Sequence, residues 1–427
     1  MATLSKVTVK HPEKVKDRQN FQLMLFDLEP TGHHGSYIEY VLKFWCEEQL
    51  QGHLNIVVSP ELIEQHPHLL NFATQSEQKN ICFIAIKPEE AQLPSPQSFT
   101  GRIKRAFQEW QLLQKYTSQL QPDHCLLLFL DSVLLRFGLG AKLPCPFSAI
   151  YFRPIFHYSQ FPHYQPSLRE KIWHWRDKLC LSTLLKSPQL EKIFSLDPFA
   201  VKPLQDFKSS TKIVHLPDPV EIVNSSQSQA QQLKSSLGIE SGRRTFLLFG
   251  LLAARKGIYQ LLEALPLLSP SLQKKLTILL VGVVASEDEA KFSTQVSQLS
   301  QTLGVQIICH HEFISEAQIQ LYYQLTDVIL APYQRHVGMS GILVRAAAAG
   351  KPVLSTNYGL MGEITRRYEL GLTVDATQPQ EITQGLEQFL QQSPSSFCNP
   401  ITMEKFAQQN HAEKFTQVIF NNLLETD

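Results

Sequence analysis

The sequence of 427 residues has neither a surplus of charge of one sign nor a long hydrophobic run. Lysine plus arginine and aspartate plus glutamate number 39 each, so the formal net charge is zero. A balanced charge gives no indication of nucleic acid as a partner. No stretch reaches the ~18–20 apolar residues of a membrane-spanning helix, and residues 1–17 lack the apolar core of a signal peptide. We therefore expect neither a secreted nor an integral membrane protein.

The sequence also lacks paired cysteines. Its seven cysteines are odd in number, widely scattered and free of any C-x-x-C pair. This pattern disfavours a disulfide framework and a structural zinc site. We expect a reducing, cytoplasmic location.

Apolar residues make up 43% of the sequence and charged residues 18%, which is typical of a globular protein. The length favours two domains of roughly 200 residues each. Short apolar runs alternate with helix-period segments, a pattern typical of parallel α/β layers, so we predict an α/β fold with two doubly wound sheets. The predicted strands are 21–28, 54–58, 81–86, 125–130, 147–152 and 193–196, then 245–249, 276–281, 306–309, 328–330 and 353–355; the predicted helices include 36–49, 102–120, 167–185 and 258–267.

A Pro-rich turn within 213–220 and the polar, Ser- and Gln-rich stretch 221–241 indicate a linker between the two domains. We predict a first domain over 1–218 and a second over 219–400. A final long helical pattern, 402–424, falls after the second sheet is complete.

The first candidate site is a loop between the first strand and the first helix. It reads E-P-T-G-H-H-G-S and contains Gly32 and His34. Parallel sheets place ligands at such loops, and the N–H groups of a helix N-terminus favour an anion. Gly32 is therefore a candidate binding residue, and His33 and His34 can polarise a phosphate or orient a hydroxyl. Simple turn chemistry is the alternative.

Two further histidines occupy comparable positions. His157 follows a buried strand at its carboxyl end, and His336 lies beside the glycine-rich loop described next. Lone histidines are more often structural, so both readings stay open.

The second domain opens with a strand followed by G-L-L-A-A-R-K-G. Arg255 and Lys256 lie just beyond the strand, where they can hold a pyrophosphate through charge-assisted hydrogen bonds, and Gly250 allows close approach of a ligand. A solvated basic turn is the alternative. Further on, Ser340 and Gly341 begin a short Ala-rich helix whose free N–H groups suit a phosphate.

Two predicted helices combine tryptophan with basic side chains, at 102–110 and 167–179. Such a pattern can dock an enzyme on an anionic membrane surface. A core face opposite a solvated face is the alternative.

The segment 327–363 resembles the nucleotide-sugar-binding segment of family 4 retaining glycosyltransferases, which have the GT-B fold. Gly250, Lys256 and Gly257 are in register with the family's G-R-L-x-x-x-K-G pattern, and D-V-I-L-A-P at 327–332 matches its D-V-x-L-x-P. The resemblance extends over roughly 245–375. It implies two Rossmann-like domains facing a cleft, with 401–427 as a helix that crosses back onto the first domain.

The resemblance also implies a function. A nucleoside diphosphate sugar would be the donor, no metal or other cofactor would be required, and the acceptor would be a carbohydrate, a lipid or a small molecule. Lys256 would contact the donor diphosphate, and Ser340 and Gly341 would supply N–H groups to it.

The sequence departs from the family at the Glu-x7-Glu pair, which falls on Val337 and Arg345, and at an arginine that falls on Leu251. We hypothesise that Arg345 takes over diphosphate binding and that Glu363 offers a carboxylate. Two other readings stay open. One is a catalytically impaired protein that binds a nucleotide sugar or a partner as a scaffold, and the other is a different sugar-nucleotide enzyme, such as an epimerase.

Overall fold

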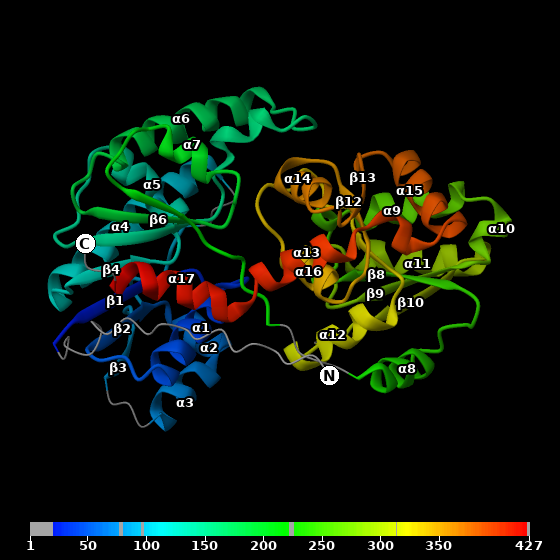
Figure 1. The fold of residues 1–427 in the computed structure, drawn as a ribbon, viewed down its shortest axis with the longest axis horizontal. Coiled ribbons are helices and arrows are strands. Elements are labelled where there is room, and N and C mark those ends of the chain that lie inside the picture. The colour runs from blue at the N-terminus through cyan, green and yellow to red at the C-terminus, as the bar shows by residue number, and fades with distance from the viewer. Residues whose placement is uncertain (1–19, 77–79, 95–97, 222–225, 313, 425–427) are drawn as a thin grey trace.

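The computed structural model describes residues 20–76, 80–94, 98–221, 226–312 and 314–424. Within these residues two β-sheets form the centres of two lobes that lie side by side (Figure 1). All strand pairs are parallel. Parallel sheets are covered by helices on both faces, which explains why most strands are continuous apolar runs.

The first sheet has the strand order β3-β2-β1-β4-β5-β6-β7. Neighbouring residues of β1 point to opposite faces, so Leu25 packs with Trp45 of α1, whereas Met24 packs in the cluster that contains Trp110 of α4. The strands are β1 (Gln22–Asp27), β2 (His53–Val58), β3 (Ile81–Ala85), β4 (His124–Leu127), β5 (Phe147–Tyr151), β6 (Leu190–Ser195) and β7 (Lys212–His215). The helices are α1 (His34–Glu47), α2 (Pro60–Gln65), α3 (Pro67–Gln75), α4 (Phe99–Leu120), α5 (Leu130–Gly138), η2 (Ile155–Gln160), α6 (Leu168–Leu184) and α7 (Val201–Gln205).

The second sheet has the strand order β10-β9-β8-β11-β12-β13. Its strands are β8 (Arg244–Phe249), β9 (Leu276–Val281), β10 (Gln306–His310), β11 (Val328–Ala331), β12 (Val353–Thr356) and β13 (Gly371–Val374). The helices are α8 (Gln227–Ser236), η3 (Ala254–Lys256), α9 (Ile258–Ala264), η4 (Leu265–Leu267), α10 (Pro270–Gln273), α11 (Glu289–Thr302), α12 (Glu316–Leu325), α13 (Gly341–Ala348), α14 (Gly359–Arg367), α15 (Pro379–Gln391) and η5 (Pro394–Phe397).

The prediction of two doubly wound sheets is confirmed, and the predicted strands match within a few residues. The prediction that 221–241 is only a linker is wrong, because this stretch contains α8. Ala230 of α8 is buried in the same cluster as Tyr322 of α12. The domain boundaries at 218 and 400 remain predictions.

The predicted single helix over 402–424 is divided into α16 (Pro400–Gln409) and α17 (Ala412–Leu424). Asn410 interrupts it, because its side-chain oxygen accepts a hydrogen bond from the backbone N–H of Asp218 at 3.1 Å and its carbonyl accepts one from Val220 at 3.1 Å. Phe406 of α16 packs in the second lobe, and Phe415 of α17 packs in the first.

The crossing onto the first lobe therefore begins at Ala412 and not at 401. Figure 1 shows α17 against the first lobe and α16 between the two lobes. Residues 425–427 of the predicted crossover lie outside the described residues.

Candidate functional site

Each sheet has one place where the strand order reverses. In the first sheet this place lies between β1 and β4, and in the second it lies between β8 and β11. In open α/β sheets ligands bind outside the carboxyl ends of the strands at such a switch point. The loops after β1, β4, β8 and β11 are therefore where a site is expected.

An aspartate–histidine pair lies at the switch point of the first sheet. Asp27 ends β1 and His34 begins α1, and His34 Nδ1 lies 2.6 Å from Asp27 Oδ2. Both residues are buried, with exposed fractions of 8% for His34 and 2% for Asp27. Burial lowers the pKa of His34, but the charge and the hydrogen bond of Asp27 raise it more, so this pKa lies above its usual value. Because Nδ1 is engaged by the carboxylate, Nε2 is the ring nitrogen left to exchange a proton.

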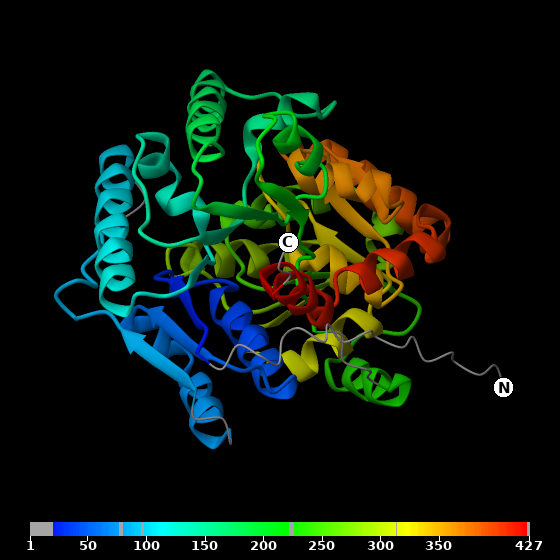
Figure 2. The same ribbon diagram turned by 60° about the vertical axis from the view of Figure 1, so that its left-hand side comes forward.

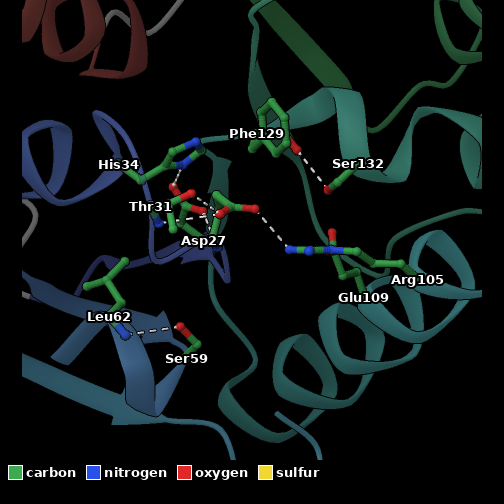
Figure 3. A network of polar contacts seen from close by, with 10 residues as sticks. Asp27, Thr31, His34, Ser59, Leu62, Arg105, Glu109, Phe129 and Ser132 are labelled. Carbon is green, nitrogen blue, oxygen red and sulfur yellow. Dashed lines mark hydrogen bonds and ion pairs between the residues drawn. The ribbon is translucent and has the colours of Figure 1, made fainter. Parts of the chain in front are cut away.

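A polar network holds the loop that carries this pair (Figure 3). Asp27 Oδ1 accepts a hydrogen bond from the backbone N–H of Glu29 at 3.0 Å. Arg105 of α4 reaches Glu29 with Nη2 at 3.0 Å and Glu109 with Nε at 2.5 Å. Gly32, the predicted binding residue, has a φ of 77° with no atom within 4 Å of an added Cβ, so the backbone turn itself accounts for a glycine there. The network fixes Asp27 and thereby the orientation of His34.

Lys256 lies at the switch point of the second sheet. Its Nζ donates a hydrogen bond to the last carbonyl of β8 at 2.8 Å and lies 5.2 Å from the ring centroid of Tyr333, which follows β11. A Cβ on Gly250 would lie 2.6 Å from this Nζ, and one on Gly257 would lie 1.9 Å from the carbonyl oxygen of Pro332. Two glycines thus allow the lysine and the strand ends to come together. The predicted close approach of a ligand at Gly250 stays a prediction.

Cations from both lobes surround His336 in the loop after β11. Burial lowers the pKa of His336 to about 4, and the charges of Arg255, Arg153 and Lys256 contribute to this decrease. The imidazole is therefore neutral at pH 7. The grouping of Arg255 and Lys256 with a third cation creates a local positive field, although the chain as a whole has no net charge.

Ser340 and Gly341 stand at the start of α13, next to this group. Ser340 Oγ lies 3.5 Å from the hydroxyl of Tyr333, whose ring faces Lys256. The side chain of Ser340 does not cap the helix. This arrangement is compatible with the predicted phosphate site, whose residues remain predictions.

Arg153 was not predicted from the sequence, and it joins the two groups. It follows β5 in the first lobe, and its guanidinium lies 5.7 Å from the ring centroid of Phe129. That ring contacts His34 edge-on, with centroids 5.1 Å apart. A Cβ on Gly338 in the second lobe would lie 3.5 Å from Arg153 Cγ. The sequence does show a basic residue directly after a buried strand. That Arg153 lies beside the second lobe, however, follows only from the arrangement of the lobes.

Arg345 lies near the segment that connects the two lobes, which includes Asp218 and Val220. It is close enough to the buried Asp218 to lower the pKa of that carboxyl, while burial raises this pKa more strongly. The neighbouring helix start also meets this segment, because a Cβ on Gly341 would lie 3.3 Å from Val220 Cγ2. The role of Arg345 in diphosphate binding stays a prediction with no described contact in its favour.

Both carboxylate oxygens of Glu363 are held by arginines of its own helix. Arg366 donates to one at 2.9 Å and Arg367 to the other at 2.5 Å. Burial raises the pKa of Glu363, but these two hydrogen bonds and charges lower it more. A doubly paired carboxylate is a weak base, so the structure argues against the predicted catalytic role of Glu363.

His157 forms a second buried pair, with Nε2 2.8 Å from Asp197 Oδ2. It also lines a pocket of about 290 Å³ between η2, α6 and α7. Phe156 and Phe207 supply apolar walls, and Lys178 is among the polar residues of the lining. The described residues thus contain two buried histidine–aspartate pairs, and of these the pair of His34 lies at a switch point.

The described residues contain no group of three or more His, Cys, Asp or Glu side chains that could hold a metal ion. In the same residues no helix is both long and apolar enough to cross a membrane. All seven cysteines are free thiols.

Residues 229–410 match the model of a protein family described as Glycosyl transferases group 1. A search of curated proteins found no match.

Several solved structures share the whole fold. A Candida albicans trehalose-6-phosphate phosphatase N-terminal domain has 12% identity and a TM-score of 0.65, covering 94% of this chain and 96% of that one. A glycosyltransferase from Rickettsia africae has 15% identity and a TM-score of 0.61, covering 96% and 100%. Anabaena HepE in complex with UDP has 14% identity and a TM-score of 0.62, covering 95% and 99%. At these identities the likeness is one of fold.

The two sheets, their switch points and the family match lead to one assignment. The chain has the two-sheet α/β fold of the GT-B glycosyltransferases, and its residues 229–410 match the glycosyl transferases group 1 family.

Proposed function

We propose that the chain transfers a sugar from a nucleoside diphosphate sugar to an acceptor hydroxyl, without a metal, between its two lobes. The observation that carries this proposal is the continuous line of contacts between the two switch points. It runs from His34 through Phe129 to Arg153, and from there to the loop of Gly338 and His336 in the second lobe. A base and an anion site thus share one interdomain face.

The donor diphosphate would lie among the cations of this face. Negative charge builds up on the diphosphate as its bond to the sugar breaks, so donors fixed in advance lower the barrier. Lys256, Arg255 and Arg153 supply positive charge, and neutral His336 can donate or accept a hydrogen bond. The N–H groups at Ser340 and Gly341 would add to this binding.

His34 would act on the acceptor. As the acceptor oxygen bonds to the sugar carbon, its proton passes to His34 Nε2, and the diphosphate leaves with the electron pair of the broken bond. Asp27 stabilises the imidazolium that forms, because its carboxylate already holds Nδ1 at 2.6 Å. The pocket beside His157 is a candidate place for part of a carbohydrate, lipid or small-molecule acceptor. A cytoplasmic location, and contact with the inner face of a membrane, remain predictions.

A panel of UDP-, GDP- and ADP-sugars tests the proposal through release of the nucleoside diphosphate with and without added acceptors. UDP-glucose is the first donor to try, because Anabaena HepE has been solved in complex with it. We expect turnover with at least one donor and its loss in His34→Asn. Turnover that survives in His34→Asn would refute the proposed base.

A scaffold that binds the nucleotide sugar without turnover is the second candidate function. It is favoured by Val337 and Arg345, which stand where the resembling family has two glutamates. Tight binding of a donor with no release of nucleoside diphosphate under any condition would support it.

A further inference from the structure

Helix α6 is apolar on two opposite faces. One face is buried against the first lobe and includes Cys180, Leu181 and Leu184. The other face carries four large apolar side chains that point outward: Leu168 (80% exposed), Ile172 (65%), Trp175 (65%) and Leu179 (47%).

These four side chains form a single stripe. At about 100° per residue, positions 168, 172, 175 and 179 fall within about 60° of one another, and they extend over about 17 Å of helix. Ten large apolar side chains are exposed in the described residues, and four of them belong to this stripe. Exposed apolar side chains are ordinary when scattered singly, but a continuous stripe indicates a contact surface.

Basic side chains flank the stripe on both sides. Arg169 and Arg176 lie along one side, at about 70–90° from the centre of the stripe, and Lys171 and Lys178 lie along the other. The pKa of Arg102 on α4 is lowered by burial and by the charges of Arg169, Arg153 and Arg176, so positive charge is concentrated here.

The two carboxylates of α6 are turned away from this surface. Asp177 is buried and paired with Arg176. Glu170 faces the second lobe, where it pairs with Arg335 at 3.0 Å and accepts a hydrogen bond from the hydroxyl of Tyr358 at 3.0 Å. The outward face of α6 is thus apolar and cationic.

Figure 1 shows α6 at the outer edge of its lobe, and Figure 2 shows the same green helix at the top of the molecule. Trp173, on the flank of the helix, lies between the guanidinium groups of Arg102 and Arg169, at 5.2 and 4.7 Å from its ring centroid. By contrast, Trp110 of the other predicted Trp-containing helix is buried, so that helix follows the core interpretation.

We propose that the outward face of α6 docks on an anionic phospholipid bilayer. The stripe enters the boundary between headgroups and acyl chains, and the flanking cations meet the lipid phosphates. A second copy of the chain fits less well, because a two-fold contact through this stripe would place cations against cations. This docking does not depend on the proposed transfer reaction.

Co-sedimentation with vesicles tests the proposal. We expect the protein to bind vesicles of phosphatidylglycerol and phosphatidylcholine, and to bind phosphatidylcholine alone at least about tenfold more weakly. The double variant Ile172→Gln, Trp175→Gln should weaken binding to the anionic vesicles by about tenfold or more. The matched control is Ile401→Gln on α16, which changes an apolar side chain that is 79% exposed elsewhere.

A charge reversal gives a second readout. Lys171→Glu should reduce binding to anionic vesicles by about tenfold, whereas the exposed Lys275→Glu in the other lobe should not. Thermal melting checks that each variant folds. Binding of UDP, measured without vesicles, tests the proposed donor site separately from lipid binding.

Three results would overturn the proposal. One is no binding of the unaltered protein to anionic vesicles, and another is equal binding of the double variant and the Ile401→Gln control. The third is a dimer in solution that the double variant converts to a monomer, because the stripe would then be a contact between copies.

Discussion

Replacing Asp27 with asparagine isolates the contribution of its charge to the proposed base. Asparagine keeps the size of the side chain but cannot stabilise an imidazolium at His34, whose Nδ1 lies 2.6 Å from the carboxylate. A hydrogen bond to a charged group contributes about 1.5–3 kcal/mol, and a factor of ten in rate corresponds to about 1.4 kcal/mol. We therefore expect Asp27→Asn to lower kcat by about 10- to 100-fold. His34→Asn, which removes the base, should cost about 10²- to 10⁴-fold.

The pH dependence changes in a defined direction. The base must be neutral, so the rate of the unaltered enzyme should rise with pH through the raised pKa of His34. In Asp27→Asn burial still lowers the pKa of His34, but the carboxylate charge that raised it is lost. The acidic limb of the pH–rate profile, where the rate rises with pH, should therefore move to lower pH.

Stability supplies an independent check. Because the pKa of His34 is higher in the folded than in the unfolded protein, protonation of His34 stabilises the fold. This stabilisation is complete below the unfolded pKa of about 6.5 and is lost as the pH rises through the folded pKa. The loss of melting temperature in Asp27→Asn should accordingly be larger at about pH 6 than at about pH 9.

The assay measures release of nucleoside diphosphate against pH, with the donor that the panel identifies. His33→Asn is the matched control, since His33 is the exposed neighbour of His34. An Asp27→Asn enzyme with full kcat and an unmoved acidic limb would refute the proposed role of the pair.

Three further predictions concern the donor site and the fold. Lys256→Ala should weaken UDP binding by about 10- to 100-fold, measured by calorimetry, whereas Lys275→Ala at the amino end of β9 should leave it unchanged; equal effects would contradict the site. Gly257→Ala should lower the free energy of unfolding by about 1–3 kcal/mol, because φ is 76° and a Cβ would lie 1.9 Å from the carbonyl of Pro332; a neutral effect in denaturant would count against this. Phe420→Ala should destabilise the first lobe by about 3–5 kcal/mol, and an unchanged melting temperature would mean that α17 does not hold there.

The sequence predicted the two sheets because buried parallel strands are short, continuous apolar runs that can be recognised one at a time. It also placed Lys256 and His34 at strand ends. It did not pair His34 with Asp27, because a loop of six residues, 28–33, can direct a histidine in many ways. Only the folded turn decides among them.

Features that depend on distant segments could not be predicted in this way. The break at Asn410 arises because its side chain binds Asp218, which lies 192 residues earlier in the chain. Arg153 is held by Asp131 of its own lobe, but it lies beside Gly338 of the second lobe only because the two lobes fold together. The apolar stripe on α6 was hidden, because a helix that is apolar on two opposite faces has no single direction of periodicity.

The two passages of the chain between the lobes are joined to each other. The backbone N–H of Val220 donates to the carbonyl of Asn410, and Val220 pairs with His411 as a short parallel bridge. Two connecting segments without mutual contacts would let the lobes slide or twist relative to each other. Two segments that are hydrogen-bonded at one point favour rotation about a single hinge. Any opening that admits a donor and releases a product must then rotate both segments together, so an exchange rate measured at the buried amide of Val220 would report on the motion of the whole enzyme.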